Sequence, residues 1–396
     1  MSSPELRLKA GRERSLLRRH PWVFSGAVEE IIGSPQSGAT VRVCAADGKF
    51  LAWAAYSPAS QIRARVWSFD EAEVPGPGLF RKRIEVAVAR RRAQIAVEAT
   101  NAVRLVHGES DGLPGLVADR YDDTLVVQLL SAGSEKWRDE LIGILRERSG
   151  CVRIYERSDT DTRELEGQPA RSGWVLGTAS GPLRIAEHGI EYEVDPASGQ
   201  KTGFFLDQRD NRLCVKHLAA GRDVLDCFCY TGGFSLSALA GGARTVLGID
   251  SSAQALAQAN RNLGLNRIAP GRAEWLEADV FQALRRLQRD GRRFDLIVLD
   301  PPKFAPTAKD AARAARGYKD VNLNALKLLR PGGLLATFSC SGGVSLELFQ
   351  KIVAGAAADA GASLLLRERY RAAPDHPVRI EFPEGEYLKG FLLEKS

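Results

Sequence analysis

The stretch DVLDCFCYTGGFSLSALAGGARTVLGID (residues 223–250) decides the fold class. Two short apolar runs, 223–229 and 245–250, flank a glycine-containing loop and a helix-like segment. Apolar strands that alternate with helices are typical of a parallel sheet covered by helices on both faces. The stretch therefore predicts the start of a Rossmann-like α/β sheet.

The same alternation continues towards the end of the chain. Further strands are predicted at 273–279, 294–300 and 333–339, and further helices at 252–265 and 346–361. The last two predicted strands, SLLLRERY (363–370) and EYLKGFLLE (386–394), have only a loop between them. They predict an antiparallel hairpin at the edge of the sheet.

Acidic residues mark the carboxyl ends of the predicted strands, where ligands bind in such sheets. Asp226 lies within the first strand, and Asp250, Asp279 and Asp300 end the next three. Asp250 follows Asp226 by 24 residues, a spacing typical of an acid that binds ribose hydroxyls. The alternative is that the aspartates cap the helices that follow them.

The loop CYTGGF (229–234) separates the first strand from its helix, and its glycines let a ligand approach the backbone. The loop lacks the G-x-G-x-x-G pattern and has no basic cluster for a pyrophosphate, which disfavours a nicotinamide-dependent reductase. An acid inside the first strand instead suits a ligand with a positive charge and a free amine, and S-adenosylmethionine has both. The cofactor-binding residues predicted in this region are Asp226, Tyr230, Thr231, Gly232, Asp250, Ser251, Asp279, Val280 and Asp300.

The segment DPPKF (300–304) follows the fourth strand. Its two prolines fix the backbone and delay the next helix, so carbonyl groups and the Asp300 carboxylate face the ligand side. Such groups can accept hydrogen bonds from the amine of a flipped base. Pro301, Pro302 and Lys303 are therefore predicted to contact substrate, and a purely structural Pro-Pro turn is the alternative.

The N-terminal part carries the excess positive charge. Residues 1–92 contain 16 Lys and Arg against 9 Asp and Glu, whereas the whole chain has a net charge of +6. Basic residues mixed with Trp22 and Phe24 suit a surface that binds phosphates and stacks bases, although these aromatics can also be core. A solvated surface is the alternative for the charge. The predicted RNA-binding arginines are Arg12, Arg14, Arg18, Arg19, Arg63 and Arg65.

Composition shifts predict three domains. Residues 1–78 form a small β-rich module with an Asp47-Gly48 hairpin turn, and DEAEVPGPG (70–78) is its linker. Residues 79–195 form a central α/β domain without a catalytic constellation, and residues 196–396 form the sheet described above.

The remaining composition limits the cellular setting. Six scattered cysteines, at positions 44, 151, 214, 227, 229 and 340, form no disulfide framework and suit a reducing cytoplasm. The Cys227–Cys229 pair has no partner pair or nearby histidine, so no metal site is predicted. No apolar run is long enough to cross a bilayer, and the N-terminus lacks a secretory signal, so we expect a cytoplasmic protein without a membrane partner.

With these motifs assembled, the chain resembles the bacterial 23S ribosomal RNA large-subunit cytosine-5 methyltransferases that carry an N-terminal PUA domain. The resemblance covers essentially the whole length. Its segments are GRERSLLRRHPWVFSGAV (11–28), AYSPASQIRARVW (55–67), GESDGLPGL (108–116), HGIEYEVD (188–195), KTGFFLDQRDNR (201–212), FCYTGGFSLSA (228–238), DPPKF, RGYKD (316–320), FSCSG (338–342) and FPEGEYLKGF (382–391). It implies a PUA-like β-barrel, a seven-stranded methyltransferase sheet, S-adenosylmethionine as donor, and one cytosine of 23S ribosomal RNA or a large-subunit assembly intermediate as substrate.

The resemblance also implies roles for individual residues. The segment KTGFFLDQRDNR looks like the family's lid over the cofactor, with Gln208 and Arg209 as candidates for the methionine carboxylate. Cys340 resembles the cysteine of the S-C-S/N segment in carbon-5 methyltransferases. Glu384 is the first choice for the base, because uridine-type relatives place a glutamate in this region. Glu386, a solvated turn and the weaker candidate His376 remain alternatives.

The chemistry explains why a cysteine decides between reaction types. Carbon 5 of cytosine is a poor nucleophile, so these enzymes first add a thiolate at carbon 6, whereas a nitrogen needs no such help. Cys340 follows the strand after DPPKF, beside the predicted base pocket, and packing is its alternative role. Some RNA cytosine-5 enzymes carry a second cysteine in the segment that corresponds to DPPKF, where this chain has proline.

Two other functions remain open at this point. One is an RNA methyltransferase of the same fold that acts on a guanine or adenine nitrogen. The other is a ribosome-assembly factor that binds RNA without catalysis. The sequence also leaves open whether the chain forms a homodimer.

Overall fold

A computed structural model describes residues 3–97, 100–179, 181–269, 271–304 and 311–396 of the chain. The chain divides into two compact units. The first contains residues 1–187, 194–206 and 374–385, and the second contains residues 188–193, 207–373 and 386–396. The domain boundaries predicted at 78/79 and 195/196 follow composition rather than compactness, and they stay predictions.

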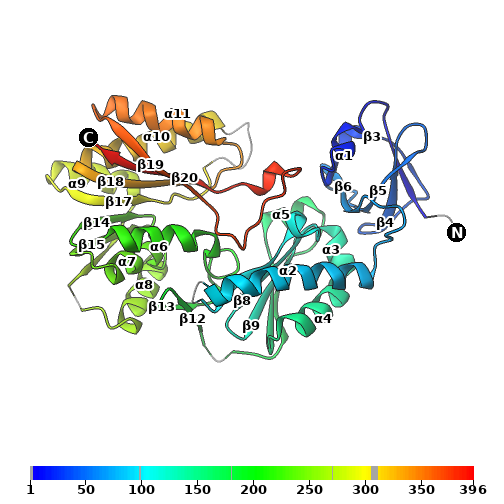
Figure 1. Cartoon of the computed structure of the whole chain (residues 1–396), viewed down its shortest axis with the longest axis horizontal. Coiled ribbons are helices and arrows are strands. Elements are labelled where there is room, and N and C mark those ends of the chain that lie inside the picture. Colours follow the sequence, from blue (N-terminus) through cyan, green and yellow to red (C-terminus); the bar gives the residue numbers. More distant parts are fainter. Residues whose placement is uncertain (1–2, 98–99, 180, 270, 305–310) are drawn as a thin grey trace. The chain divides into compact units, whose positions relative to one another are not determined.

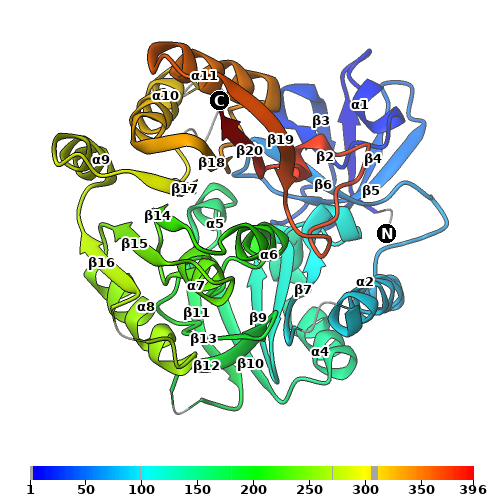
Figure 2. The same cartoon turned by 60° about the vertical axis from the view of Figure 1, so that its left-hand side comes forward.

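One sheet of seven strands organises the described part of the second unit (Figure 1, Figure 2). Its strands are β14 (Asp223–Cys227), β15 (Thr245–Asp250), β16 (Ala273–Glu277), β17 (Phe294–Leu299), β18 (Leu329–Ser339), β19 (Leu364–Arg371) and β20 (Lys389–Lys395). Their spatial order is β16-β15-β14-β17-β18-β20-β19. The five strands from β16 to β18 run parallel, and β20 is antiparallel to both β18 and β19. This confirms the predicted fold class, including the antiparallel pair at the edge.

Helices cover both faces of this sheet, as Figure 1 and Figure 2 show. They are α6 (Arg209–Leu218), α7 (Gly233–Ala240), α8 (Ala253–Leu265), α9 (Val280–Arg289), α10 (Ala311–Leu328) and α11 (Leu346–Asp359). Helices α9, α10 and α11 share one apolar core with the strands, in which the buried residues include Leu284, Tyr318 and Phe349. Helix α6 packs against α7. Because every central strand is buried, β17 reads as the unbroken apolar run predicted for a parallel sheet.

Two glycines allow close packing near the carboxyl ends of the strands. A Cβ atom on Gly248 of β15 would lie 2.5 Å from the Trp275 ring and 3.1 Å from Cys229 Sγ. Gly232, in the loop after β14, has a φ of +81°, and its Cβ would lie 3.1 Å from Trp275. The indole of Trp275 therefore packs against bare backbone on two neighbouring segments.

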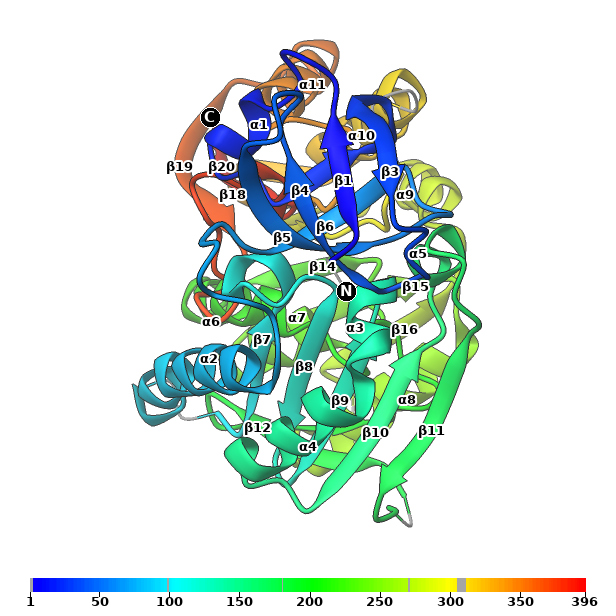
Figure 3. The same cartoon turned by 90° about the vertical axis from the view of Figure 1, so that its right-hand side faces the viewer.

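The first unit begins with a six-stranded sheet, counted over the described residues, in the order β2-β6-β5-β4-β1-β3 (Figure 3). Its elements are β1 (Glu5–Leu8), α1 (Arg14–Leu17), β2 (Trp22–Phe24), β3 (Val28–Ile32), β4 (Thr40–Cys44), β5 (Phe50–Tyr56) and β6 (Ile62–Ser68). Strands β4 and β5 pair antiparallel across the predicted turn, where Gly48 has a φ of +86°. The hairpin prediction is confirmed.

A second sheet in this unit has the order β11-β10-β9-β8-β7 over its described strands and has its own apolar core. Its elements are α2 (Pro77–Val97), β7 (Ala102–His107), β8 (Leu116–Tyr121), β9 (Thr124–Leu129), α3 (Ala132–Lys136), α4 (Arg138–Ser149), β10 (Arg153–Ser158), α5 (Asp161–Leu165) and β11 (Arg171–Leu176). Helix α2 starts at Pro77, inside the predicted linker, because proline suits the first turn of a helix. The strands β12 (Leu183–Glu187) and β13 (Ile190–Val194) follow.

Every helix in the described ranges is too short or too polar to cross a lipid bilayer.

Candidate active site

Asp226 is buried at the carboxyl end of β14, with 1% of its surface exposed. One carboxylate oxygen accepts a hydrogen bond from Ser235 Oγ at 2.6 Å, and the other, Oδ1, has no partner among the described residues. Burial raises the pKa of this carboxyl to about 7, and the charges of Asp300 and Asp250 raise it further, although the Ser235 bond opposes them. A buried acid with an unused oxygen is suited to a cationic amine.

Asp250 fastens the loop after β14 to the end of β15. Its Oδ2 accepts a hydrogen bond from the Tyr230 backbone N–H at 2.9 Å, and its Oδ1 accepts one from the Ser252 N–H at 2.9 Å. Phe228 and Tyr230 both have positive φ, 62° and 49°, which non-glycine residues adopt only at a cost. The Asp250 carboxylate thus stabilises a strained loop that faces the same strand ends.

Asp279 has the alternative role that the sequence left open. It is exposed and caps α9, accepting a hydrogen bond from the Gln282 N–H at 2.9 Å. Val280, the first residue of α9, is buried in the core, and Ser251 is exposed after β15. Helix capping therefore accounts for Asp279, and cofactor contacts of Asp279, Val280 and Ser251 stay predictions.

The loop residues Thr231 and Gly232 are held by backbone hydrogen bonds. The Asn262 side chain, fully buried in α8, donates to the Thr231 carbonyl at 3.1 Å. The Gly232 N–H donates to the Cys229 carbonyl at 2.8 Å, and Gly232 is the N-cap of α7. The amide groups at this helix start can face a ligand because no Cβ covers them.

Gln208 links the segment before β14 to the end of β17. Its amide nitrogen donates to Asp300 Oδ2 at 2.9 Å, and its amide oxygen accepts from Asn211 at 2.6 Å. Arg209, at the start of α6, is completely buried, with Nε 3.7 Å from Asp210 Oδ1. The structure brings Gln208 and Asp300 together, as expected if both belong to one site.

Cys340 follows the last residue of β18 and is half-buried. The Tyr318 hydroxyl, buried on α10, lies 2.9 Å from Ser341 Oγ, one residue beyond the thiol. Burial raises the pKa of Tyr318; hydrogen bonds from Ser339 and Ser341 oppose this, and the charges of Cys340 and Asp300 add to it. Tyr318 thus has both Cys340 and Asp300 as electrostatic neighbours. Strands β17 and β18 are adjacent and parallel, so the two residues share one edge of the sheet.

The residues after Asp300 differ in exposure. Pro301 is buried, Pro302 and Lys303 are exposed, and the Phe304 ring packs 4.8 Å from the Tyr318 ring, measured between centroids. Next to Cys340, a Cβ on Gly342 would meet nothing within 4 Å. Exposed Lys303 and open space at Gly342 agree with an accessible base site, and their contact with substrate stays a prediction.

The two glutamates considered as the base belong to different units. Glu384 is in the first unit, where its Oε2 lies 3.1 Å from His20 Nε2. Glu386 belongs to the second unit with Cys340, and its charge raises the pKa of Lys389. His376 is buried in the first unit, 2.9 Å from Asp375 Oδ1. The identity of the base stays a prediction.

The predicted RNA-binding arginines fall into two groups. Arg12, Arg14, Arg18 and Arg19 are exposed on and around α1. Arg63 is half-buried and donates to the Pro58 carbonyl. Arg65 is not on the surface: it is 6% exposed and pairs with Glu109 Oε1 at 2.9 Å and Glu166 Oε1 at 3.0 Å. Arg65 therefore joins the two sheets of the first unit instead of facing RNA.

Sequence reasoning missed two residues of the Cys340 region as individual candidates, Tyr318 and Lys389. Both lie in quoted segments, RGYKD and FPEGEYLKGF, and Lys389 is 7% exposed. A lysine that opens an apolar strand was the available signal, since lysines are rarely buried without a partner.

The residues present fit S-adenosylmethionine. The unused Oδ1 of buried Asp226 matches an ammonium group, and the glycine at the start of α7 leaves room for backbone contact. No His, Cys, Asp or Glu side chains gather in groups of three that could hold a metal, over the residues that the structure describes.

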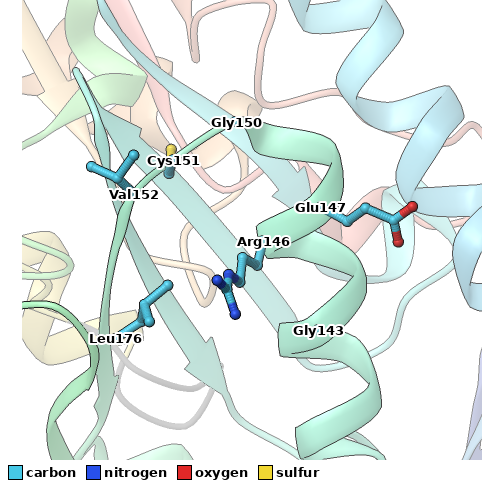
Figure 4. A pocket seen from close by; sticks show the side chains of 7 residues that line it. All are labelled: Gly143, Arg146, Glu147, Gly150, Cys151, Val152 and Leu176. Atoms are coloured by element: carbon cyan, nitrogen blue, oxygen red, sulfur yellow. The ribbon is translucent and has the colours of Figure 1, made fainter.

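A separate open cavity of about 540 Å³ lies beside the end of α4 in the first unit (Figure 4). Its lining includes Arg146, Glu147, Cys151 and Leu176, and no predicted site residue is among the residues that line it. Burial raises the pKa of Cys151, which makes this thiol less reactive.

Comparison with known proteins gives two family matches. Residues 104–390 match the S-adenosylmethionine-dependent methyltransferase family, and residues 6–69 match the PUA-like domain. A protein of Shewanella amazonensis named ribosomal RNA large subunit methyltransferase I is 49% identical over 391 residues, covering 98% of this chain and 99% of its own. The protein of the same name from Serratia proteamaculans is 50% identical over 385 residues, or 97% of each chain.

Solved structures agree on the fold. A proposed SAM-dependent methyltransferase from Streptococcus mutans has a TM-score of 0.85 at 22% identity, covering 98% of this chain and 99% of that chain. A second structure, a proposed methyltransferase in complex with SAH, has a TM-score of 0.86 at 22% identity with the same coverage.

Proposed function

The chain belongs to the S-adenosylmethionine-dependent methyltransferase family, and from this membership we propose that it methylates carbon 5 of one cytosine in large-subunit ribosomal RNA. The family confirms the predicted cofactor. The choice of ribosomal RNA is supported by the printed name of the 48–50% identical relatives and by the PUA-like domain. The 23S molecule as substrate comes from the sequence resemblance.

One observation carries the choice of carbon 5. Cys340 ends β18, next to the strand that ends at Asp300, and Tyr318 has the charges of both as neighbours. A methyltransferase for a ring nitrogen needs no thiol at this place, whereas attack through carbon 5 requires one. The position of Cys340 is therefore best explained by covalent catalysis.

The proposed steps balance as follows. The Cys340 thiolate adds to carbon 6 of the cytosine, and the electron pair of the carbon 5–carbon 6 bond makes carbon 5 nucleophilic. Bound S-adenosylmethionine supplies the methyl group that carbon 5 receives. A base then removes the carbon 5 proton, the double bond forms again, and the Cys340 thiolate leaves carbon 6. Asp300 accepts a hydrogen bond from the exocyclic amine of the base.

We propose Glu384 as that base, as the resemblance implies. Its carboxylate pairs with His20, which can keep it ionised when the histidine is protonated. Glu386 is the matched comparison, because it lies two residues away in the same turn region. If Glu384 is the base, Glu384→Gln should accumulate protein–RNA adduct that Glu386→Gln does not, seen as a slow band in denaturing gels. Adduct in Glu386→Gln alone would move the role to Glu386.

Cys340→Ala tests the function. The variant should lose methylation of unmodified large-subunit RNA by at least about 10³-fold, because the carbon 5 route has no other nucleophile. Labelled donor and mapping of 5-methylcytosine give the readout. Cys214→Ala is the matched control, a half-buried cysteine of the same unit, and should stay active.

Full activity of Cys340→Ala, or label found on a ring nitrogen, would overturn the carbon 5 assignment. Absence of S-adenosylmethionine binding by titration calorimetry would instead favour the non-catalytic RNA-binding alternative.

A further inference from the structure

Lys389 contacts the backbone on both sides of Cys340. It opens β20 and is the Cα partner of Ser339 in the antiparallel β18–β20 pair, so it lies opposite the residue before the thiol. Its Nζ donates to the Ser341 carbonyl at 2.9 Å and to the Val344 carbonyl at 2.8 Å. These carbonyls belong to the turn after Cys340, which the Val344 N–H closes on the Ser341 carbonyl at 3.1 Å. One ammonium group therefore fixes the turn that carries the thiol.

The burial of this ammonium group needs an explanation. Lys389 is 7% exposed, and no carboxylate of the described residues forms an ion pair with it. Burial lowers the pKa of Lys389, and the charges of Cys340 and Glu386 raise it. A buried cation that contacts only neutral carbonyl groups costs free energy. An anion that forms beside it would offset this cost, and the Cys340 thiolate is such an anion.

We propose that Lys389 is a positioning residue for Cys340, which holds the turn from Ser341 to Val344 in place and favours the thiolate over the thiol. The inference rests on the proposed function, in which Cys340 is the nucleophile. Lys389 acts through the turn and through its charge, and it need not touch the RNA base.

Other charged groups surround the same turn. Tyr318 approaches it from α10, Asp300 from the end of β17, and Glu386 from the segment before β20. Asp300 and Glu386 carry negative charge and disfavour a thiolate, and the hydroxyl of Tyr318 stays neutral because burial raises its pKa. Lys389 supplies positive charge against this background.

The chain provides a matched control in Lys395. It lies in the same strand, its Nζ donates to the Leu326 and Leu329 carbonyls at 2.7 and 2.8 Å, and burial lowers its pKa as well. Its listed electrostatic neighbour is Arg293 and not Cys340. Lys395→Met should therefore lose similar hydrogen bonds without affecting the thiol.

The experiment measures alkylation of Cys340 by iodoacetamide as a function of pH, followed at this cysteine by peptide mass spectrometry. It needs neither RNA nor cofactor. In Lys389→Met the alkylation rate at pH 7 should fall about tenfold and the midpoint should move up by about one pH unit, because the thiolate is the reacting form. Lys389→Arg should restore much of the rate, and Lys395→Met should match the wild type.

Lys389→Gln keeps the design decisive if the methionine variant fails to fold, since an amide still donates to a carbonyl but carries no charge. An unchanged profile in folded Lys389→Gln or Lys389→Met would overturn the inference. Failure of the proposed function has a different signature: Cys340→Ala would remain active while the alkylation shift persisted.

Discussion

The side chain of Gln208 donates a hydrogen bond to Asp300 Oδ2 at 2.9 Å and accepts one from Asn211 at 2.6 Å. Gln208 is 2% exposed, so these bonds are shielded from water. They connect the segment resembling a cofactor lid to the aspartate that precedes Pro301. The orientation of the Asp300 carboxylate thus depends on a residue 92 positions earlier in the chain.

Gln208→Leu removes this donor and acceptor at nearly constant volume. We expect the free energy of unfolding to fall by about 1–3 kcal/mol, because Asn211 and Asp300 lose buried partners. Methylation should fall more than S-adenosylhomocysteine affinity if Asp300 acts mainly on the base. Urea unfolding and calorimetry provide the measurements, and unchanged stability would show that water replaces the side chain.

Asp226 should make stability depend on pH. Its pKa in the folded protein is about 7, whereas its ordinary value is 3.8. The folded state keeps this proton as pH rises while the unfolded chain loses it, so stability falls between about pH 4 and pH 7. Asp226→Asn cannot ionise, and it should exceed the wild type at pH 8 by on the order of 4 kcal/mol. Unfolding at pH 4 and pH 8 measures the difference, which should vanish at pH 4.

The same carboxyl should control cofactor binding in the opposite direction. An ammonium group binds the ionised carboxylate better than the neutral acid, so affinity should rise as pH increases through 7. Calorimetry with S-adenosylhomocysteine at pH 6 and pH 8 should show tighter wild-type binding at pH 8. Asp226→Asn should bind weakly at both values. Equal pH dependence in the variant would assign the effect to another group.

Gly248 is sensitive to added volume. The Cβ of Gly248→Ala would lie 2.5 Å from the Trp275 ring, so the ring or strand must move, at a cost of about 1–3 kcal/mol. Gly264→Ala is the control, because a Cβ there meets nothing within 4 Å and lies in helix α8. It should stabilise the protein by about 0.5–1 kcal/mol. Thermal unfolding distinguishes the two, and equal effects would argue against the contact.

The exposed arginines and buried Arg65 should behave differently. Replacing Arg12, Arg14, Arg18 and Arg19 with Gln should weaken binding to a ribosomal RNA fragment and flatten its salt dependence by about 0.7 per lost phosphate contact. Arg65→Gln should instead destabilise the protein by about 3–5 kcal/mol, because two buried carboxylates lose their partner. Filter binding across a salt series and unfolding separate the cases. A flattened slope in folded Arg65→Gln would contradict this division.

Periodicity predicted the sheet well because its strands are buried on both faces. Strand β15 has the predicted bounds, 245–250, since its apolar run is interrupted at both ends. Strand β18 begins at Leu329 instead of 333, although Pro331 and the glycines after it resemble a turn. Pairing between Leu329 and Phe294 outweighs this local preference, and a register shift accommodates it.

The site was predictable to the extent that it follows strand ends. Asp226, Asp300 and Cys340 lie at those ends, so placing the strands placed these residues. Arg65 could not be assigned, because its partners Glu109 and Glu166 are 44 and 101 positions away. Likewise, alternation on a strand does not say whether a polar face meets water or another sheet. The role of Lys389 depends on the same kind of distant contact.

The segment after Ala373 completes both units, and this has a consequence for synthesis. Residues 374–385 fold with the first unit, whereas β20 lies between β18 and β19 of the second. During translation, β18 and β19 therefore emerge before the strand that separates them exists. Until then two apolar edges stay open to wrong pairing or to a chaperone. A ribosome that stalls before residue 386 would release a chain in which the Cys340 turn lacks its lysine.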